Sequence, residues 1–525
     1  MLGKYLIKLL GKPHGCHRFK SISSSTLRLI TTFGGQQSPV GHDGDNRMDG
    51  QSTGGREKFF QRLIPVSHYM ERQQKLVNMI DDYLDYDKSL SKENGSVIVV
   101  SGANRIYVAD TRIPTIHFKQ NSDFLYLTGL NTREAAHCAL VIIADGRSFK
   151  SHLFVPFTTA EHTIWEGDGL LGPYYRDHLS SVVNEHNDFV KLSEFLKEHT
   201  KRNIFLSKAG LDLSLPSISG HAETKSTVKE DPFKGLKVIN VSHLIDRLKV
   251  IKSSSEISSM QRTCEIGGLA MNSSRDWSQN QVILNRENFN FNSVMESQIA
   301  AHFDYTSRSN GACKPSYPPV VAGDDRATII HYGANDKPVN SNEWILMDAG
   351  CEDLEGYCSD ITRSWPIFGE IPSSKSKLSQ ELYEALSDTQ LTLISFAEKN
   401  LHEISLNDLF HAMCHYLSQV IAEFGLAPKG DDAIRLADHF CPHHVSHYLG
   451  LDVHDTPTID RKVKLVNGMC FTIEPGLYFR HGDPKAKKEF QGIGLRVEDN
   501  FAIDHDGKLI NLTKSCPHIL HPNSN

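Results

Sequence analysis

Three absences narrow the class of this 525-residue sequence. No run of about 18 apolar residues occurs, so no membrane span is predicted. The ten cysteines include no C-x-x-C pair, which favours reduced thiols in an intracellular compartment over a disulfide scaffold or a structural zinc site. An excess of positive charge is missing too, because the formal net charge is −7, and this argues against a nucleic-acid partner. With 39% apolar and 23% charged residues, the composition is that of a soluble globular protein, and the length predicts two domains.

Acidic residues are absent from residues 1–42, which carry six basic residues. The first lysines recur every four residues and line one side of a helix, with leucines toward the other side. An amphipathic, basic, hydroxyl-rich start is typical of an organelle transit peptide, and a disordered basic tail is the alternative. Residues 34–55 are rich in Gly, Gln and Ser, which predicts a flexible linker. We therefore assign residues 1–55 to a mitochondrial transit peptide and linker, and expect the mature protein in the mitochondrial matrix.

The globular pattern begins near Arg56 and changes character near residue 243. Residues 69–84 carry apolar side chains at helical spacing. Three buried-looking strands follow, at 96–100, 139–143 and 151–155. Strands that alternate with helical stretches predict an α/β domain over 56–242. A new helical pattern then begins, and we place a second domain over 243–525.

Four carboxylates in the second half stand beside or within apolar strands. They are Asp348, Asp360, Glu474 and Glu498. Asp348 ends an apolar segment, and Asp360 follows after a connection long enough for a hairpin that brings the two together. Glu498 is expected on a strand, on the same side as Arg496. Because an unpaired buried carboxylate costs several kcal/mol, Arg496 could neutralise one of the four and metal ions the others.

A run of histidines supplies nitrogen ligands near these carboxylates. Four lie in one short stretch, His443, His444, His447 and His454. The run is not a zincin motif, because His443 is not followed by Glu. Two divalent ions would balance four carboxylates, and a bridging hydroxide would leave the cluster near neutral with one imidazole as a neutral ligand. Oxygen-rich sites with one imidazole suit Mn²⁺ or similar hard ions, so we predict two Mn²⁺ or other divalent ions.

These motifs resemble the creatinase/aminopeptidase P/prolidase group of pita-bread metallopeptidases, over residues 96–130 and 245–505. The resemblance implies an α/β protein with an N-terminal α/β creatinase-like domain followed by a C-terminal pita-bread metallopeptidase domain. It implies that Asp348 holds one metal ion, that Asp360 and Glu498 bridge the pair, and that His447 and Glu474 bind the other ion. Residues 120–129 look like aminopeptidase P and not like methionine aminopeptidase.

The same resemblance implies a substrate site and a reaction. Substrate-binding residues would be Tyr317, His331, His443 and His454, and catalytic residues would be His331, His443, His454, Glu474 and Arg496. The reaction would hydrolyse the first peptide bond of peptides or proteins through a metal-bridging hydroxide. It would favour Xaa-Pro N-termini, or trim imported mitochondrial proteins by one residue. The group's N-terminal domain usually mediates self-association, so a homodimer is expected.

The sequence departs from the family pattern at two places near the rim of the site. Asp324 stands where relatives usually have Gly, and residues 276–294 look like a polar insertion.

Two further interpretations stay open at this point. A prolidase would be restricted to dipeptides, and a peptide of greater length that is cleaved well would exclude it. A catalytically inactive binding protein on the same fold should have lost metal ligands, whereas all five are present here.

Overall fold

The computed structural model describes residues 62–108, 113, 117–156, 163–164, 167–172, 175–207, 233–289, 292–367 and 373–518. The transit peptide and linker predicted for residues 1–55 lie outside these ranges. Among the described residues, no helix combines the length and the apolar character that crossing a membrane requires.

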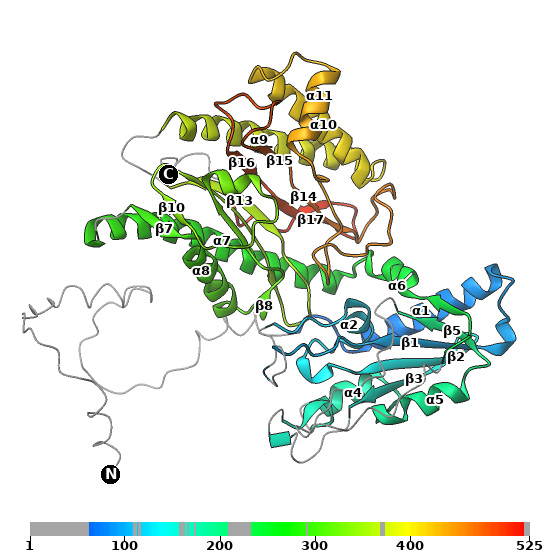
Figure 1. Ribbon diagram of the computed structural model, residues 1–525. Coiled ribbons are helices and arrows are strands. Elements are labelled where there is room, and N and C mark those ends of the chain that lie inside the picture. Colours follow the sequence, from blue (N-terminus) through cyan, green and yellow to red (C-terminus); the bar gives the residue numbers. More distant parts are fainter. Residues whose placement is uncertain are drawn as a thin grey trace, which may run out of the picture. The chain divides into compact units, whose positions relative to one another are not determined.

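A mixed six-stranded sheet forms the N-terminal domain, with strand order β4-β3-β2-β1-β5-β6 (Figure 1). Its strands are β1 (Ser96–Ser101), β2 (Ala139–Asp145), β3 (Ser148–Val155), β4 (Glu185–Asp188), β5 (Asn203–Leu206) and β6 (Val238–Asn240). Its helices are α1 (Ser67–Tyr86), α2 (Ser122–Thr128), α4 (Arg176–Val182), α5 (Leu192–Glu198) and α6 (Ser242–Lys249). β1 is buried along its whole length, as expected for a β-branched central strand. The three strands and the first helix predicted from the sequence are all present, and Pro156 directly follows β3.

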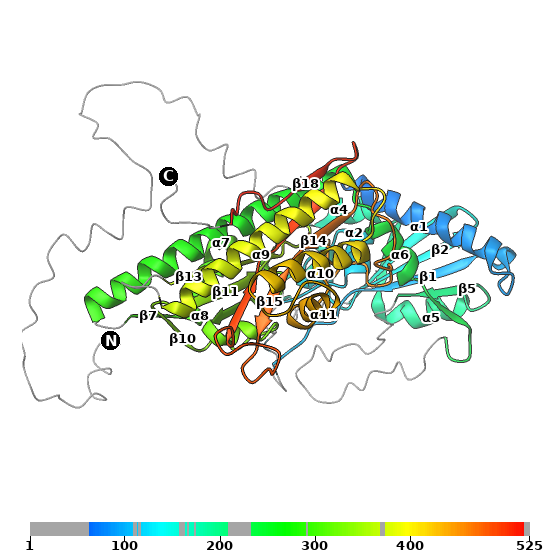
Figure 2. The same ribbon diagram turned by 90° about the horizontal axis from the view of Figure 1, so that it is seen from above.

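The second domain places short antiparallel strands between two groups of helices (Figures 1 and 2). Its helices are α7 (Ser254–Phe289), α8 (Glu296–Ser309), α9 (Ser374–Lys399), α10 (Leu406–Glu423) and α11 (Asp431–Phe440). Its strands are β7 (Ser293–Met295), β8 (Lys314–Pro315), β9 (Val320–Gly323), β10 (Pro338–Asn340), β11 (Trp344–Ala349), β12 (Cys351–Glu352), β13 (Ile361–Pro366), β14 (Cys470–Ile473), β15 (Gly476–Phe479), β16 (Ile493–Arg496), β17 (Asp499–Ile503) and β18 (Leu509–Asn511). α7 and α8 contact the strands on one side, and α9 and α11 contact them on the other.

Local sequence signals explain how helix α10 begins and ends. Ser405 caps α10 in a capping box with Asp408, in which each side chain accepts from the other residue's backbone N–H. Gly425 follows the helix with φ +66°, a conformation that favours glycine after a helix end. Much of the polar insertion predicted at 276–294 continues helix α7 as far as Phe289. The insertion is therefore in large part an extension of an existing helix.

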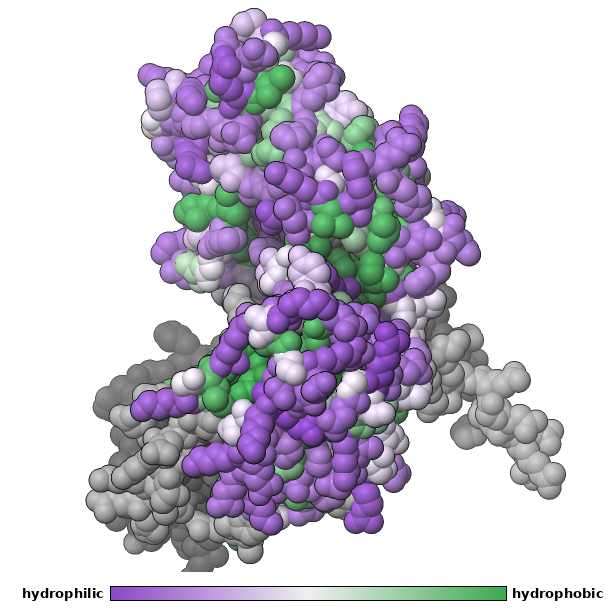
Figure 3. Space-filling model, turned by 90° about the vertical axis from the view of Figure 1, so that its right-hand side faces the viewer, coloured by the Kyte–Doolittle hydropathy of each residue, from purple (hydrophilic) through white to green (hydrophobic). Residues whose placement is uncertain are grey.

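The two domains share one hydrophobic core cluster. Leu76 and Ile80 of α1 belong to the same cluster as Met260 of α7 and Leu449 of the second domain. Helix α6 packs on α1, while α7 runs along the second domain, so the helical pattern after residue 243 divides between the two. The outer surface is mostly hydrophilic on the face in Figure 3, where hydrophobic residues gather in separate patches. The boundary at residue 243 stays a prediction.

Candidate metal centre

Asp348 and Asp360 lie together because β11 and β13 pair antiparallel. In this pairing Asp348 stands opposite Thr362, which places it beside the start of β13. The Tyr317 hydroxyl donates to Oδ1 of Asp348 and to Oδ1 of Asp360, the latter at 2.5 Å. The connection between the two aspartates therefore returns the chain as the sequence predicts, and Tyr317 joins them.

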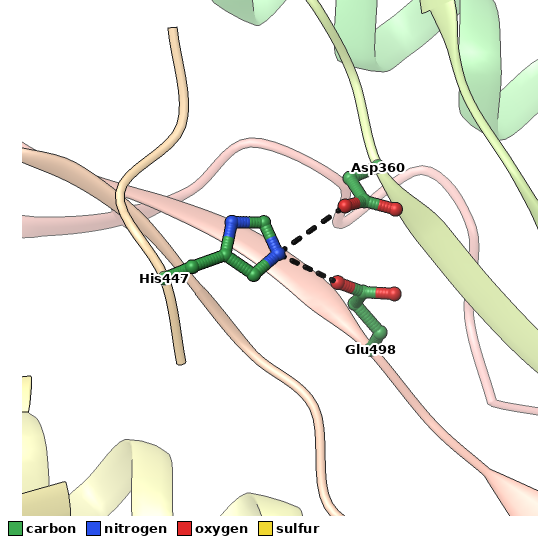
Figure 4. A group of neighbouring side chains, drawn as sticks. All are labelled: Asp360, His447 and Glu498. Carbon is green, nitrogen blue, oxygen red and sulfur yellow. Dashed lines mark ion pairs between the residues drawn. The ribbon is translucent and has the colours of Figure 1, made fainter. Parts of the chain in front are cut away.

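His447 brings the remaining carboxylates to the same point. Its Nε2 atom lies 3.4 Å from Asp360 Oδ2, 3.5 Å from Glu474 Oε1 and 3.9 Å from Glu498 Oε1. Figure 4 shows Asp360, His447 and Glu498 pointing toward one another from three separate segments. One donor atom from each of these three buried residues lies within 4.8 Å of the other two, a spacing that could hold a metal ion. The sequence-predicted ligands thus converge on a single centre.

Glu498 corrects one expectation from the sequence. It was predicted on a strand, but it falls between β16 and β17 and forms an isolated bridge with Thr362 of β13. Its backbone N–H donates to the Thr362 carbonyl at 3.1 Å, and the Thr362 hydroxyl donates to its Oε2 at 2.7 Å. The neighbouring residues still alternate, since Leu495 and Val497 lie in the hydrophobic core while Arg496 faces the carboxylates. The chain leaves regular pairing at the residue whose side chain enters the centre.

The charges of this centre repel one another strongly. Burial raises the pKa of Glu474 to about 7, against the opposing charges of His447 and Arg496. Burial also raises the pKa of Asp348, and with the nearby carboxylates it raises that of Glu498 well above its ordinary value. Burial acts in the same direction on Asp360, but the hydrogen bond with His447 lowers its pKa overall. These shifts are those of four closely spaced carboxylates, two of them buried and two half-buried, that share too few cations.

The donor set fits divalent cations. Oε1 of Glu498 is buried and has no hydrogen-bond partner among the described residues, although it faces His447. An orphaned buried carboxylate oxygen is costly unless a cation meets it. Four carboxylates and one imidazole form an oxygen-rich set, which suits hard or borderline divalent ions. Asp348, Asp360, His447, Glu474 and Glu498 are therefore the residues that would hold metal.

Arg496 and His443 border this centre from β16 and from the histidine run. Arg496 donates through Nη2 to Asp348 Oδ2 at 2.5 Å and through Nη1 to the Tyr478 hydroxyl at 2.7 Å. His443 lies with Nε2 3.0 Å from the same hydroxyl and with Nδ1 3.8 Å from Glu474 Oε2. Burial and the Arg496 charge lower the pKa of His443 to about 3, so its imidazole is neutral. Both side chains are held in fixed positions beside the ligands.

The remaining predicted histidines lie at the open side of the centre. His454 packs edge-on against His447, with 4.4 Å between ring centroids, and is otherwise exposed. Partial burial of the ring lowers the pKa of His454, and the charges of His447 and His331 act in the same direction. His331 is itself exposed. The two histidines are thus within electrostatic reach of each other and accessible to a substrate.

Comparison with known proteins decides the family. Residues 258–505 match metallopeptidase family M24, and residues 69–204 match the aminopeptidase P N-terminal domain. Xaa-Pro aminopeptidase 3 of Rattus norvegicus is 31% identical over 500 residues, which cover 92% of this chain and 88% of the relative. The chain belongs to the aminopeptidase P family of metallopeptidases. The predicted fold class, an N-terminal aminopeptidase P domain followed by a pita-bread domain, is confirmed.

A plant relative and a solved structure are also similar to this chain, the latter in fold. The mitochondrial intermediate cleaving peptidase 55 of Arabidopsis thaliana is 27% identical over 521 residues, covering 98% of this chain and 91% of that protein. A solved structure of an Escherichia coli aminopeptidase P variant shares the fold with a TM-score of 0.70. That structure is 23% identical in sequence and covers 87% of this chain and 97% of its own.

Sequence reasoning missed three side chains that support the aminopeptidase P centre. Thr362 contacts Glu498, and it also accepts from Arg496 Nε at 3.0 Å. The Tyr478 hydroxyl connects Arg496 with His443. Asn500 accepts from the Asp360 backbone N–H at 2.9 Å and donates to the Asp360 carbonyl. The two-residue period of strands could have found Thr362, which stands two positions after Asp360.

Proposed function

We propose that this protein is a two-metal Xaa-Pro aminopeptidase of the mitochondrial matrix, with Mn²⁺ as its working ion. It would release the first residue from peptides or proteins, favouring proline in second position or trimming imported proteins by one residue. The observation that carries the proposal is the convergence of three carboxylates, Asp360, Glu474 and Glu498, on His447, with one oxygen of Glu498 left unpartnered among the described residues. Tyr317 joins the fourth carboxylate, Asp348, to Asp360. The relative named as a mitochondrial intermediate cleaving peptidase supports the location and the trimming activity.

The bound ions would supply a nucleophilic water and polarise the scissile carbonyl. The other tasks fall to side chains of this chain. Glu474 lies beside His443 and His447, where it can accept a proton and pass it to the departing nitrogen. His454, which packs on His447, and the exposed His331 would hydrogen-bond the substrate and the carbonyl oxygen on which negative charge develops. Neutral His443 and Tyr317 complete the substrate pocket.

The leaving nitrogen of an Xaa-Pro bond is tertiary and has no N–H to donate. A site that requires a hydrogen bond from the nitrogen of the second residue would reject proline. The pocket must therefore bind the proline ring through van der Waals contacts. The exposed histidines and the Tyr317 ring offer such contacts without requiring an N–H. The site can therefore tolerate proline, and the hydrolysis rates of matched peptides measure whether it prefers proline.

The test compares matched peptides on metal-loaded protein lacking residues 1–55. One set begins Xaa-Pro, and a second set begins with Tyr, Leu or Phe and lacks proline. We expect turnover of one residue from peptides longer than dipeptides, which excludes a prolidase. Asp360→Asn should abolish turnover, while the exposed Asp304→Asn on α8 should leave it unchanged. Wild-type protein that cleaves neither set under any metal loading would instead support the inactive binding protein.

Metal binding can be measured without turnover. A ligand that binds only the folded state stabilises it by about 2.7 kcal/mol at 100 times its dissociation constant. Titration of Mn²⁺ into chelator-treated protein should therefore raise the melting temperature of the wild type and much less that of Asp360→Asn. Equal melting curves with and without Mn²⁺, Co²⁺ and Zn²⁺ would contradict the metal centre. The expected homodimer is tested by the mass of the mature protein in solution.

A further inference from the structure

Two pockets meet at Arg480, just outside the metal centre. The first has a volume of about 470 Å³ and includes His443, His444, Asp438 and Arg480 in its lining. The second has a volume of about 480 Å³ and lies beside Ile329, Ile330, His481 and Arg480. Because His443 also lies 3.8 Å from Glu474, the first pocket has a wall in common with the metal centre. Arg480 is the side chain that the two pockets share.

The alternation of strand β15 explains why Arg480 faces this side. Leu477 and Phe479 point into the hydrophobic core. Tyr478 points the other way, where its hydroxyl meets Arg496 and His443. Successive side chains of a strand point to opposite faces. Arg480 directly follows the last residue of β15 and lies on the side of Tyr478, where it lines both pockets. Tyr478 and Arg480 therefore form a row of side chains that leads from the metal centre to the solvent.

The guanidinium of Arg480 is not committed to another group. It is exposed and makes no ion pair or side-chain hydrogen bond with any described residue. Its charged neighbours are paired elsewhere, His439 with Asp483 at 2.6 Å and Arg326 with Glu296 at 2.7 Å. Asp438 is the one acidic lining residue of the first pocket. Arg480 thus presents a permanent positive charge where two pockets open.

An aminopeptidase holds one substrate residue before the scissile bond, so all of the remaining peptide lies beyond it. A pocket that leads outward past His443 would receive those downstream residues. We propose that Arg480 binds a carboxylate of the substrate downstream of the second residue, either an acidic side chain or the terminal carboxylate of a tripeptide. The planar guanidinium suits carboxylates because it can donate two parallel hydrogen bonds. This inference rests on the proposed function and adds a substrate class, peptides with an anionic group after the Xaa-Pro bond.

The experiment uses Xaa-Pro peptides that differ at one downstream position. Glu, Gln or Lys occupies the third or the fourth residue of amidated peptides, and a free-acid tripeptide is compared with its amide. We expect wild type to have about five-fold higher kcat/KM for Glu than for Gln, mainly through KM, and a smaller ratio at high salt. Arg480→Gln should remove this preference, and Arg480→Glu should reverse it toward Lys. Lys485→Gln, an exposed cation in the same loop but outside both pockets, should keep it.

Binding separates this inference from the proposed function. Calorimetry with the leaving peptides Pro-Glu-amide and Pro-Gln-amide measures the preference without turnover. If wild type cleaves no peptide, the proposed function fails, and calorimetry then decides the role of Arg480 alone. Turnover with equal kcat/KM for Glu and Gln peptides overturns the Arg480 inference and leaves the proposed function standing. A preference for Lys that Asp438→Asn removes would assign the pocket to Asp438 and overturn it as well.

Discussion

Arg72 of α1 and Glu256 of α7 form a buried ion pair across the two domains, with 3.1 Å between Nη2 and Oε1. Glu256 also accepts from the Tyr357 hydroxyl at 2.6 Å and from the Ser253 backbone N–H at 2.8 Å. Arg72 in turn lies over the ring of Tyr126, 4.3 Å from its centroid. The N-terminal sheet domain is therefore joined to helix α7 of the second domain by buried charged and hydrogen-bonded groups.

Removal of one partner of this pair should be costly. Arg72→Met leaves the Glu256 charge buried without its cation, and we expect a loss of about 3–5 kcal/mol in the free energy of unfolding. The double variant Arg72→Met/Glu256→Gln should lose less than the sum of the two single variants, because neither charge is then orphaned. Denaturant unfolding measures all three. The exposed pair Arg308–Asp304 is the control, since Arg308→Met should cost less than about 0.5 kcal/mol.

The same pair predicts a pH dependence. Burial acts to raise the pKa of Glu256, but the Arg72 charge and three hydrogen bonds lower it below its ordinary value. Its stabilising contribution is therefore complete above the unfolded pKa of about 4.3 and is lost as the pH falls through the folded value. The stability difference between wild type and Glu256→Gln should narrow as the pH is lowered from about 6 to about 3. A difference that widens toward acid would contradict the ion pair.

Thr362 should tune the metal centre without holding metal. Its hydroxyl donates to Glu498 and accepts from Arg496, so Thr362→Val would free both groups while keeping the side-chain shape. We expect metal affinity or kcat/KM to fall by about 10–100-fold, measured by chelator competition and by peptide hydrolysis. Thr362→Ser keeps the hydroxyl and should stay close to wild type. Equal loss in both variants would point to packing and not to the hydrogen bonds.

Gly350 should be required for the approach of Asp348 to Asp360. A Cβ atom at this position would collide with the backbone of Ser359, the residue before Asp360. We expect Gly350→Ala to cost about 1–3 kcal/mol of stability and to reduce kcat/KM by about 100-fold, because small displacements of ligands are costly. Gly333→Ala is the matched control, since a Cβ there meets nothing within 4 Å. Wild-type activity of Gly350→Ala would show that the backbone can shift without disturbing the ligands.

The sequence predicted local structure better than it predicted contacts. Helical spacing located α1, and buried-looking runs located β1, β2 and β3. The prediction that Glu498 lies within a strand was wrong. Side chains go on alternating between the two faces from β16 into β17, so the sequence pattern does not show that the strand is interrupted there. Only the backbone pairing shows the interruption. Contacts such as that of Glu355 with the Leu63 and Ile64 amides join residues nearly 300 positions apart. No periodicity encodes such a contact, because it depends on how finished domains meet.

The side chains that hydrogen-bond the metal-site carboxylates were also hard to predict from the sequence. Tyr317 was assigned to the substrate pocket by resemblance, yet its hydroxyl touches two carboxylates that come from β11 and from the start of β13. Arg496 was recognised as a neutralising group because it stands two residues before Glu498 on the chain. Tyr478, which connects Arg496 to His443, carries no such local signal. Side chains that touch only after three strands assemble are visible only in the structure.

The order of the donors along the chain has a consequence for biogenesis. The first is residue 348 and the last is residue 498, and Glu498 is seated through its bridge to Thr362. A ribosome must therefore release nearly the whole polypeptide before the ion cage can close. Until then the nascent chain lacks a complete set of donors, so it cannot hold the metal pair or act as a peptidase itself.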